Sequence, residues 1–350
     1  MKEAIVHAGP RVEIIDSPIP KPEPGQVVIK VEVSGCNPKD WKIPEWMPNM
    51  SPSNGGDDIA GTVSAVGEGV TEFKKGDRVA AFHEMMKPGG SYAEYAVAWA
   101  HTTFFLPEKT SFEEGAAIPL AALTAAVGLY ASDRLDLPQP WSPATKPCPL
   151  IVYGASSAVG TYVLQLAIRS NIHPLICVAG RAQDHVKSMI DTSKGDTIVD
   201  YRKGDEAVVQ GLKDALKGQK VEYAFDAVSE KGSIKNIADV LDTKTGKATF
   251  VLPPPGSDFS GSYSEMPEGV KQSMTNVGSV HGPVKDLGYV YSRYFTRGLE
   301  EGFFRGQKQE VIPGGLGGIQ KGLENLKDGT ASAVKYVYKI SETPGAGSGQ

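Results

Sequence analysis

The chain has 350 residues, of which 40% are hydrophobic and 22% are charged, and its formal net charge is −5. This length suffices for two domains with buried cores, and the composition is that of an ordinary globular protein. The net charge and the lack of a long basic run argue against nucleic-acid binding. No apolar run has the length of a membrane span, and the N-terminal segment has no apolar signal core, so we expect no membrane association and a cytoplasmic location. The three cysteines, Cys36, Cys148 and Cys177, are too far apart to suggest a disulfide framework or a CxxC zinc site.

The first part of the chain has the pattern of antiparallel β structure. A proline-rich lead over residues 18–24 passes into alternating apolar residues from Val27 to Val33. Further short strands bounded by glycine turns are predicted in DIAGTVSAVGEGV, GDRVAAF and GSYAEYAVAW. We therefore expect residues 1–118 to form a β-rich unit.

The pattern then changes to alternating helices and strands. An alanine-rich segment, SFEEGAAIPLAALTAAVGLYASD, is predicted to be helical. The strand candidates that follow it are Leu150–Tyr153, Leu175–Val178, Thr197–Val199, Tyr223–Phe225, Ala248–Leu252 and Thr275–Val280. Strands separated by helices predict a doubly wound parallel sheet. The last stretch, GGLGGIQKGLENLKDGTASAVKYVYKI, predicts a helix, a glycine turn and a terminal strand that returns to the first unit, followed by a flexible tail over 346–350.

A loop of small residues joins the first strand of this array to a helix. It consists of Gly154, Ala155, Ser156, Ser157, Ala158, Val159 and Gly160. Small side chains let the backbone approach a pyrophosphate, and the free N–H groups and dipole of a helix start favour that anion. Ala158 stands where the usual fingerprint has its central glycine, so its methyl group requires the coenzyme to lie slightly further out. Such a turn is by itself weak support, but its place at the first strand–helix turn predicts a dinucleotide site.

The residues after the second and third strands bear on the choice of coenzyme. An acidic residue at the end of the second strand would hold the ribose hydroxyls of NAD, but here Gly180 and Arg181 follow. A guanidinium suits the 2′-phosphate of NADPH. Tyr201, with Arg202 and Lys187, either adds to that pocket or belongs to the solvated surface. We predict NADPH as the coenzyme.

One further segment lies at the predicted carboxyl edge of the sheet. Val251 and Leu252 end the fifth strand candidate, and ligands of such sheets bind at this edge. We predict that both pass near the nicotinamide carboxamide. The prolines that follow them are also consistent with a simple strand ending.

Several motifs together resemble the medium-chain dehydrogenase/reductase superfamily over nearly the whole chain. They are KEAIV, GQVVIKVEVSGCNPKDWK, GGDDIAGTVSAVGEGV, FKKGDRVAAF, GSYAEYAV, AAIPLAALTAAVGLY, GASSAVG and the C-terminal stretch quoted above. Within the superfamily, NPKDWK and GASSAVG are most similar to the zinc-independent quinone and enoyl reductases, above all to fungal trans-acting enoyl reductases. The resemblance implies an α/β fold in which a GroES-like catalytic domain (1–118 and 309–345) is split around a Rossmann domain (119–308), with the active site in the cleft between them.

The zinc ligands of the superfamily's alcohol dehydrogenases have no counterparts here. Asn37 has the spacing of the ligand cysteine before Asp40, and Cys36 is one place off. The segment that carries the ligand histidine reads Gly56-Asp57-Asp58. A catalytic zinc needs three protein ligands of suitable type. We expect no metal.

Without zinc, a C=C bond conjugated to a carbonyl is the easier hydride acceptor. The protein must then orient the acceptor, stabilise an enolate oxygen and supply a proton. Lys42 is the candidate for the proton or the enolate, Asn37 for orienting substrate or the nicotinamide ribose, and Asp40 for holding Asn37 or the loop. Thr124 matches the family threonine near the nicotinamide. The structural alternatives are a turn at Asn37, a helix cap at Asp40 and a solvated Lys42.

The proton donor stays open at this point. Mitochondrial-type enoyl reductases use a tyrosine shortly after this segment, but residues 44–47 read Pro-Glu-Trp-Met. Solvent is the other candidate.

The sequence thus predicts a metal-independent enzyme that uses NADPH to reduce the C=C bond of an enoyl thioester or enone. The alternatives are an NADPH:quinone reductase and, in a different class, a non-catalytic NADPH-binding partner protein. The substrate is a small molecule or is bound as a thioester, and a polyketide synthase carrier domain is a candidate partner. Monomer and homodimer both remain open.

Overall fold

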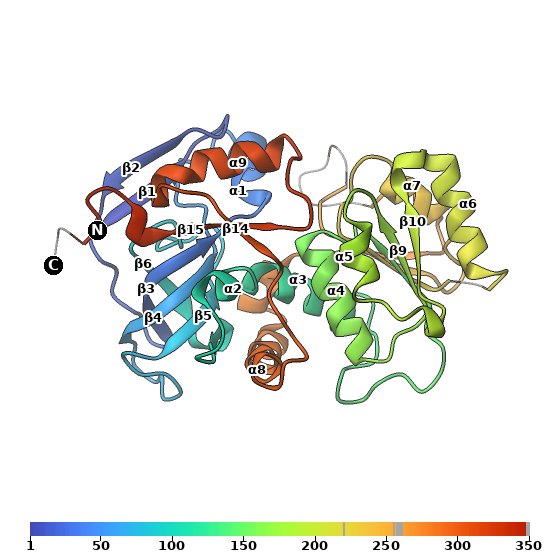
Figure 1. The fold of residues 1–350 in the computed structure, drawn as a ribbon, viewed down its shortest axis with the longest axis horizontal. Coiled ribbons are helices and arrows are strands. Elements are labelled where there is room, and N and C mark those ends of the chain that lie inside the picture. Colours follow the sequence, from blue (N-terminus) through green and yellow to red (C-terminus); the bar gives the residue numbers. More distant parts are fainter. Residues whose placement is uncertain (220, 255, 257–261, 348–350) are drawn as a thin grey trace. The chain divides into compact units, whose positions relative to one another are not determined.

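The computed structural model describes residues 1–219, 221–254, 256 and 262–347. The chain divides into two compact units, which are coloured by sequence in Figure 1. Unit 1 consists of Met1–Leu123 and Gly278–Gln350, and unit 2 consists of Thr124–Val277. None of the helices in the described part of the chain has the length and apolar character needed to span a membrane.

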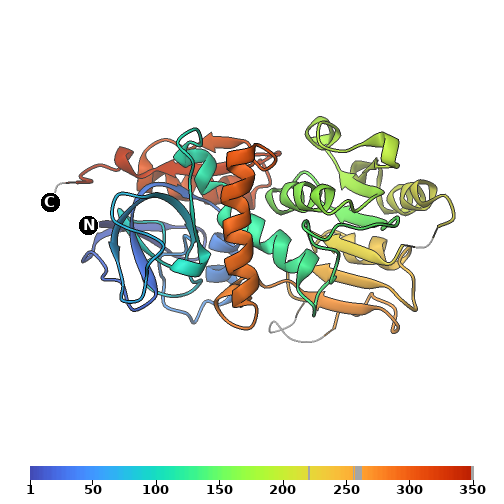
Figure 2. The same ribbon diagram turned by 90° about the horizontal axis from the view of Figure 1, so that it is seen from below.

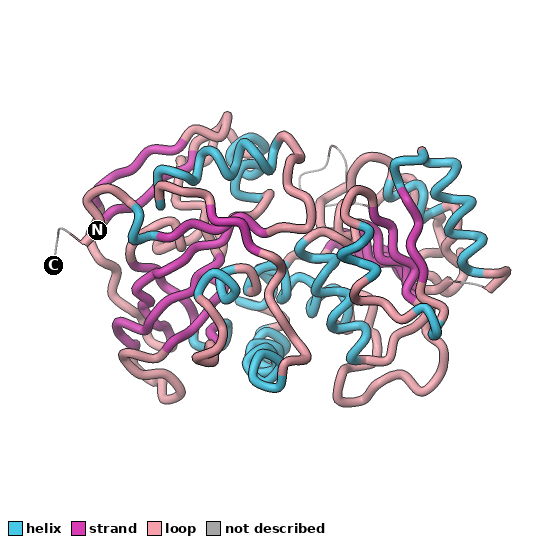
Figure 3. Tube along the Cα trace, viewed as in Figure 1, coloured by secondary structure: helices cyan, strands magenta, loops and turns pink. Residues whose placement is uncertain are grey.

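Unit 1 is rich in strands, as Figure 3 shows. Its strands are β1 (Lys2–Val6), β2 (Val12–Asp16), β3 (Gln26–Gly35), β4 (Asp58–Val66), β5 (Arg78–Phe82), β6 (Tyr95–Trp99), β7 (Thr103–Phe105), β14 (Gln309–Val311) and β15 (Lys335–Lys339). The larger sheet has the order β14-β15-β3-β4-β5-β7, with β6 also paired to β3, while β1 and β2 form a separate hairpin. The pairs between strands of the first 118 residues are antiparallel, which confirms the predicted β-rich unit.

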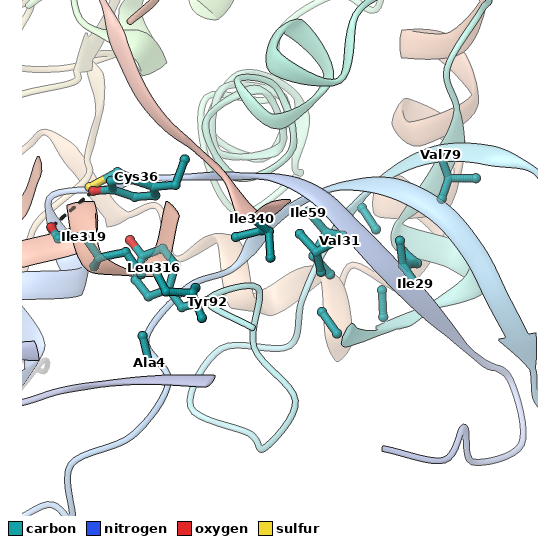
Figure 4. Close-up of a cluster of buried hydrophobic side chains, with 14 of the residues drawn as sticks. Ala4, Ile29, Val31, Cys36, Ile59, Val79, Tyr92, Leu316, Ile319 and Ile340 are labelled. Atoms are coloured by element: carbon teal, nitrogen blue, oxygen red, sulfur yellow. Dashed lines mark hydrogen bonds between the residues drawn. The ribbon is translucent and has the colours of Figure 1, made fainter. Parts of the chain in front are cut away.

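The C-terminal segment completes this unit. β15 pairs antiparallel with β3, with Val337 opposite Gly35, so the predicted return of the terminal strand is confirmed. The core combines both parts of the chain: Ile29, Ile59 and Tyr92 share one buried cluster with Leu316 and other return-segment residues, as Figure 4 shows. The early strands therefore bury their apolar face only when the return segment is in place.

The helices that begin in the described part of unit 1 are α1 (Lys39–Trp46), α2 (Phe112–Ala116), α3 (Pro119–Tyr130), α8 (Lys285–Glu301) and α9 (Ile319–Lys327). The short 3₁₀ turns are η1 (Ala100–Thr102), η5 (Gly315–Gly318), η6 (Ile340–Glu342) and η4 (Val277–His281), which starts at the last residue of unit 2. α3 continues past Leu123 into unit 2. α8, the orange helix of Figure 2, contacts η1 and β7 of unit 1. The compact units therefore divide the chain near residue 278, whereas the family resemblance implies a domain boundary at 308.

Unit 2 contains a parallel sheet. Its strands are β8 (Leu150–Tyr153), β9 (Leu175–Ala179), β10 (Thr197–Asp200), β11 (Tyr223–Asp226), β12 (Lys247–Phe250) and β13 (Lys271–Met274). Helices α4 (Ala158–Arg169), α5 (Gln183–Lys187), α6 (Asp205–Leu216) and α7 (Ser233–Ala238) connect them, with 3₁₀ turns η2 (Thr192–Lys194) and η3 (Tyr201–Lys203). The order β10-β9-β8-β11-β12-β13, with parallel pairing throughout, is that of a dinucleotide-binding sheet and confirms the predicted fold class.

The prediction for the sixth strand is wrong. Residues Lys271–Met274 form the edge strand β13, while Val277–His281 of the predicted segment form the 3₁₀ turn η4. The apolar residues Val277 and Val280 are buried without belonging to a strand. An edge strand has one neighbour only and tolerates a polar sequence, so apolar content pointed to the wrong segment.

The predicted flexible tail is described only in part. Gly347 donates its N–H to Glu94 Oε1 at 2.6 Å, and Ala346 donates to the Thr343 carbonyl at 3.0 Å. Residues 348–350 of that prediction lie outside the described residues.

Candidate active site

The loop between β8 and α4 depends on glycine at both ends. Gly154 has a φ of +74°, and a Cβ there would lie 2.4 Å from a methyl of Val228. A Cβ on Gly160 would lie 2.2 Å from the Gly154 carbonyl oxygen. The N–H groups of Gly154 and Ala155 both donate to the Val178 carbonyl at 3.0 Å, which fixes the loop to β9. The sequence thus forces a tight turn in which the helix starts directly against the strand.

The start of α4 carries the positive end of the helix dipole. Ser157 caps the helix, with its Oγ accepting the N–H of Gly160 at 3.0 Å. The N–H groups of the first turn have no carbonyl partner within the helix. Ser156, Ser157, Ala158 and Val159 are all partly exposed, and the N–H of Ser157 donates to the Gly154 carbonyl at 2.9 Å. Small side chains and the positive end of the helix dipole at this turn suit a pyrophosphate.

Two predicted residues, Gly180 and Tyr201, meet beside the ends of β9 and β10. A Cβ on Gly180 would lie 2.5 Å from the Tyr201 ring, so the ring lies on the Gly180 backbone. Arg181 follows directly and is exposed. Tyr201 is itself 47% exposed, which leaves part of its ring open to a ligand.

An ion pair next to Tyr201 was not expected from the sequence. Arg202 Nη2 lies 2.6 Å from Asp200 Oδ2, and its Nε donates to Oδ1 at 2.9 Å. This bidentate pair holds the pKa of the Asp200 carboxyl well below its usual range. Arg202 therefore balances the carboxylate at the end of β10, instead of facing a phosphate on its own.

The predicted pair Val251 and Leu252 lies just after β12, and both residues are partly exposed. The Val251 N–H donates to Ser229 Oγ at 2.9 Å, and the Leu252 carbonyl accepts from the Tyr263 hydroxyl at 2.6 Å. The chain after the fifth strand is therefore held at the carboxyl edge of the sheet, where ligands of such sheets bind.

Asp226, which the sequence pattern did not reveal, organises the neighbouring strand end. It is fully buried and accepts the N–H groups of Val228 and Ser229 and the hydroxyl of Ser233, at 2.9, 2.8 and 2.6 Å. Burial raises the pKa of its carboxyl to about 6 although these donors oppose the shift.

In unit 1, Asn37 points its side chain into a buried polar cluster. Its Nδ2 donates to Asp58 Oδ2 at 2.7 Å, and its Oδ1 accepts from Lys335 Nζ at 2.6 Å. Lys335 Nζ also lies 2.7 Å from the same oxygen of Asp58. The amide predicted to orient a ligand is thus engaged with protein groups, and Asp58 and Lys335 are site residues that sequence reasoning missed.

Asp40 holds the start of α1. Its Oδ2 accepts the backbone N–H of Asn37 at 2.8 Å and the hydroxyl of Tyr92 at 2.6 Å. Its Oδ1 lies 2.7 Å from Lys39 Nζ. Burial raises the pKa of the Asp40 carboxyl although Lys39 pulls in the opposite direction.

Lys39 extends this network to a buried histidine. Its ammonium pairs with Asp57 as well as Asp40, and His83 Nδ1 lies 2.8 Å from Asp57 Oδ1. Burial favours the neutral form of Asp57, but Lys39 and His83 outweigh it and lower the pKa of that carboxyl. The Asp57 that stands in place of a zinc-ligand histidine therefore belongs to an ion-pair network. Among the described residues no group of three or more His, Cys, Asp or Glu is arranged to hold a metal ion.

Lys42 is the predicted catalytic cation. It is only 7% exposed, and its Nζ lies 5.0 and 5.2 Å from the ring centres of Trp41 and Trp46. Lys39 and Ile43 of the same helix contribute to a cavity of about 300 Å³. Thr124 is 5% exposed and lies on α3.

Comparison with known proteins places these features in a family. Residues 23–108 match the alcohol dehydrogenase GroES-like domain. The chain is 59% identical over 316 residues to trans-enoyl reductase fsr4 of Gibberella fujikuroi, covering 90% of this chain and 91% of that protein. It belongs to the enoyl and quinone reductase branch of the medium-chain dehydrogenase/reductases. This reductase is therefore an enzyme, an oxidoreductase of a family that uses a nicotinamide coenzyme.

More distant relatives agree with this placement of the reductase. Trans-enoyl reductase resD of Aspergillus sclerotiorum is 29% identical over 97% of this chain and all of that protein. Among solved structures, the CurK enoyl reductase superposes with a TM-score of 0.75 over 96% of this chain and 98% of that one, at 17% identity. The quinone oxidoreductase of Pseudomonas syringae gives 0.70 over 96% and 99%, at 21% identity, so both structures show the shared fold.

Proposed function

We propose that this reductase uses NADPH to reduce the C=C bond of an α,β-unsaturated thioester or enone without a metal. The observation that carries the proposal is the 59% identity, over 90% of the chain, to a protein named as a trans-enoyl reductase. Membership of this enzyme family speaks against the alternative of a non-catalytic binding protein. When bound, the reduced coenzyme supplies a hydride to the β carbon of the acceptor.

The preference for NADPH is supported by the groups at the ends of β9 and β10. Arg181 comes shortly after the end of β9, where an NAD site has a carboxylate, and the Tyr201 ring lies on the backbone of the preceding residue, Gly180. The carboxylate of Asp200, which would repel a 2′-phosphate, is neutralised by Arg202. Together these groups make a cationic surface for the phosphate that distinguishes NADPH. The amides of Ser156, Ala158 and Val159 would hold the pyrophosphate, and Val251 and Leu252 the carboxamide end, while the Ser157 N–H stays bonded to the Gly154 carbonyl.

Residues of the protein must then stabilise the negative charge that forms on the substrate oxygen. We assign this role to Lys42, whose ammonium stabilises the enolate and delivers the proton to the α carbon. The Trp41 and Trp46 rings beside it keep the ammonium in a largely dehydrated setting, where such an interaction is strengthened. Asp40 holds the start of the helix that carries Lys42, and Asn37 contributes through the cluster with Asp58. Thr124 is assigned to the nicotinamide end.

The proposal also specifies a class of substrate. Several relatives are named trans-enoyl reductases, and the chloroplast envelope quinone oxidoreductase homologue of Arabidopsis thaliana is 31% identical over 75% of this chain. We favour an enoyl thioester presented by a polyketide synthase carrier domain, because the nearer similarity is to the enoyl reductase. Quinone reduction is the second candidate. A cytoplasmic location and a monomeric or dimeric state stay predictions from the sequence.

One assay tests the proposal. NADPH oxidation is measured side by side with a trans-2-enoyl N-acetylcysteamine thioester, an enone and a naphthoquinone, and the thioester product is checked by mass spectrometry. We expect the thioester to be reduced with the highest kcat/KM, and NADH to support the reaction poorly. Turnover of the quinone alone would overturn the enoyl assignment, and equal use of both coenzymes would overturn the NADPH assignment.

A further inference from the structure

The buried cluster of Asn37, Asp58 and Lys335 lies at the start of helix α3. Asp58 Oδ2 accepts from Lys335 and Asn37, and its other oxygen, Oδ1, accepts the backbone N–H of Leu120 at 2.6 Å. Leu120 is the second residue of α3, whose first residue is Pro119. Proline has no N–H, so the Leu120 amide is the first donor that this helix offers. One carboxylate thus joins a buried lysine to a helix N-terminus.

The backbone around this carboxylate is unusually close. A Cβ on Gly35 would lie 2.3 Å from the Ala116 carbonyl oxygen and 2.9 Å from Asp58 Cβ. Gly35 therefore lets the last residue of α2, Ala116, approach β3 next to Asp58. The cluster and this approach act at the same place, and together they fix where α3 begins.

Both charged side chains of this pair are buried, which has a cost in free energy. Asp58 is fully buried and Lys335 is 3% exposed. Removing two charges from water has a large free-energy cost that apolar side chains would avoid, and polar groups retained in such positions are candidates for fixing one geometry. Here the geometry is that of α3, because Asp58 accepts the N–H of Leu120 in its first turn.

Helix α3 also carries Thr124. Thr124 lies four positions after Leu120, which is about one helical turn. A helix is stiff over one turn, so the position at which α3 is held sets the position of the Thr124 hydroxyl. We infer that Lys335, acting through Asp58 and the N-terminus of α3, is a positioning residue for Thr124 in the reduction. This inference rests on the proposed function, in which Thr124 contacts the nicotinamide end.

A double-mutant cycle on kcat tests this inference. Lys335→Met keeps most of the side chain and removes its charge, and Thr124→Val removes the hydroxyl. We expect Lys335→Met to lower kcat at least tenfold in the wild-type background but less than threefold in the Thr124→Val background, because the hydroxyl that it positions is then absent. Lys339→Met is the matched control: it lies on the same strand, pairs with Glu113 at the surface, and should change kcat less than twofold.

Two further measurements separate positioning from a general loss of structure. The dissociation constant of NADPH should change less than threefold in Lys335→Met, and the effects of the two substitutions on melting temperature should add, since a structural role would not produce coupling in kcat alone. If Lys335→Met does not fold, Lys335→Arg keeps the charge and changes its geometry, and the same cycle applies.

Equal kcat losses in both backgrounds, or no loss at all, would overturn the inference. Its failure is distinguishable from failure of the proposed function, because in the latter case the wild-type protein itself does not reduce the enoyl thioester. If the wild-type protein prefers the quinone, the cycle is run with that acceptor.

Discussion

The candidate coenzyme loop and the buried cluster of Asn37, Asp58 and Lys335 are built in opposite ways. The loop is made of consecutive residues between β8 and α4, and its geometry follows from local rules of turns and helix starts. The cluster joins residues as far as 298 positions apart, from the start of α1, β4 and the terminal strand. The loop tolerates little change in residue size, whereas the cluster depends on charge. Substitutions that change size or charge alone should therefore affect the two regions differently.

The largest effect is expected for Gly160→Ala. The added methyl group would lie 2.2 Å from the Gly154 carbonyl oxygen, so backbone atoms must shift. Overpacking costs about 1–3 kcal/mol in general, and here it distorts the loop that faces the coenzyme. We expect a lower melting temperature and no measurable NADPH binding by fluorescence titration. Gly317→Ala, where the added methyl meets nothing within 4 Å, is the control. Wild-type affinity in Gly160→Ala would show that the loop does not hold the coenzyme.

A smaller effect, confined to turnover, is expected for Lys42→Ala. Loss of a positioned general acid lowers the rate by about 100-fold or more, and NADPH affinity should stay unchanged because Lys42 is assigned to the substrate oxygen and not to the coenzyme. Steady-state kinetics and a coenzyme titration measure both quantities. Lys327→Ala is a matched control, since that ammonium also lies over the Trp41 ring, at 5.5 Å, but pairs with Glu45. Unchanged kcat in Lys42→Ala would leave solvent as the proton donor.

For Arg181→Ala we expect a change in coenzyme preference. A hydrogen bond to a charged group is worth about 1.5–3 kcal/mol, which corresponds to roughly a tenfold to hundredfold weaker binding of NADPH. NADH binding should hardly change, since it lacks the 2′-phosphate. Lys187→Ala, at another exposed cation of the same region, serves as the control. Parallel losses for both coenzymes would contradict the assignment of Arg181 to the phosphate.

The smallest effect is a pH dependence of stability in unit 1. Burial lowers the pKa of His101 and of His281 to about 4 from 6.5, and the two rings lie 5.6 Å apart. Between these values the unfolded chain binds protons that the folded chain does not, so these groups make the free energy of unfolding fall as pH drops from about 6.5 to 4. The ring in His281→Phe can still stack on Phe82. The melting temperature of this variant should therefore decrease less than that of the wild type as the pH drops over this range. An identical decrease in variant and wild type would refute this account.

Unit 2 provides the opposite sign for comparison. The pKa of Asp226 is raised by burial from 3.8 to about 6, so the stabilisation from its neutral form is present at low pH and lost as pH rises through 6. Lowering the pH therefore reduces the contribution of His101 and His281 to the free energy of unfolding, and it increases the contribution of Asp226. Measuring the melting temperature of Asp226→Asn at pH 4.5 and 7 tests this: the variant should gain relative to wild type at the higher pH.

Prediction from the sequence worked best where local pattern and tertiary environment agree. Five of the strand candidates of unit 2 correspond to β8–β12, because strands between helices in a parallel sheet are short, apolar and bounded by turns. The sixth failed because β13 is a polar edge strand. In unit 1, Asn37 and Asp40 were identified from their motif, but the amide of Asn37 turned out to face Asp58 and Lys335.

The sequence by itself determined the small-residue turn of 154–160, the alternation that makes the parallel sheet, and the loss of zinc ligands around Asp57. Each of these depends on residues that are neighbours in the chain, so helix, strand and turn chemistry suffices to recognise them. Only the tertiary structure decided that Lys335 joins Asp58 at the start of α3 and that His83 joins Asp57. Such pairs form because sheet pairing brings distant segments together, and no local periodicity records which buried charges will meet.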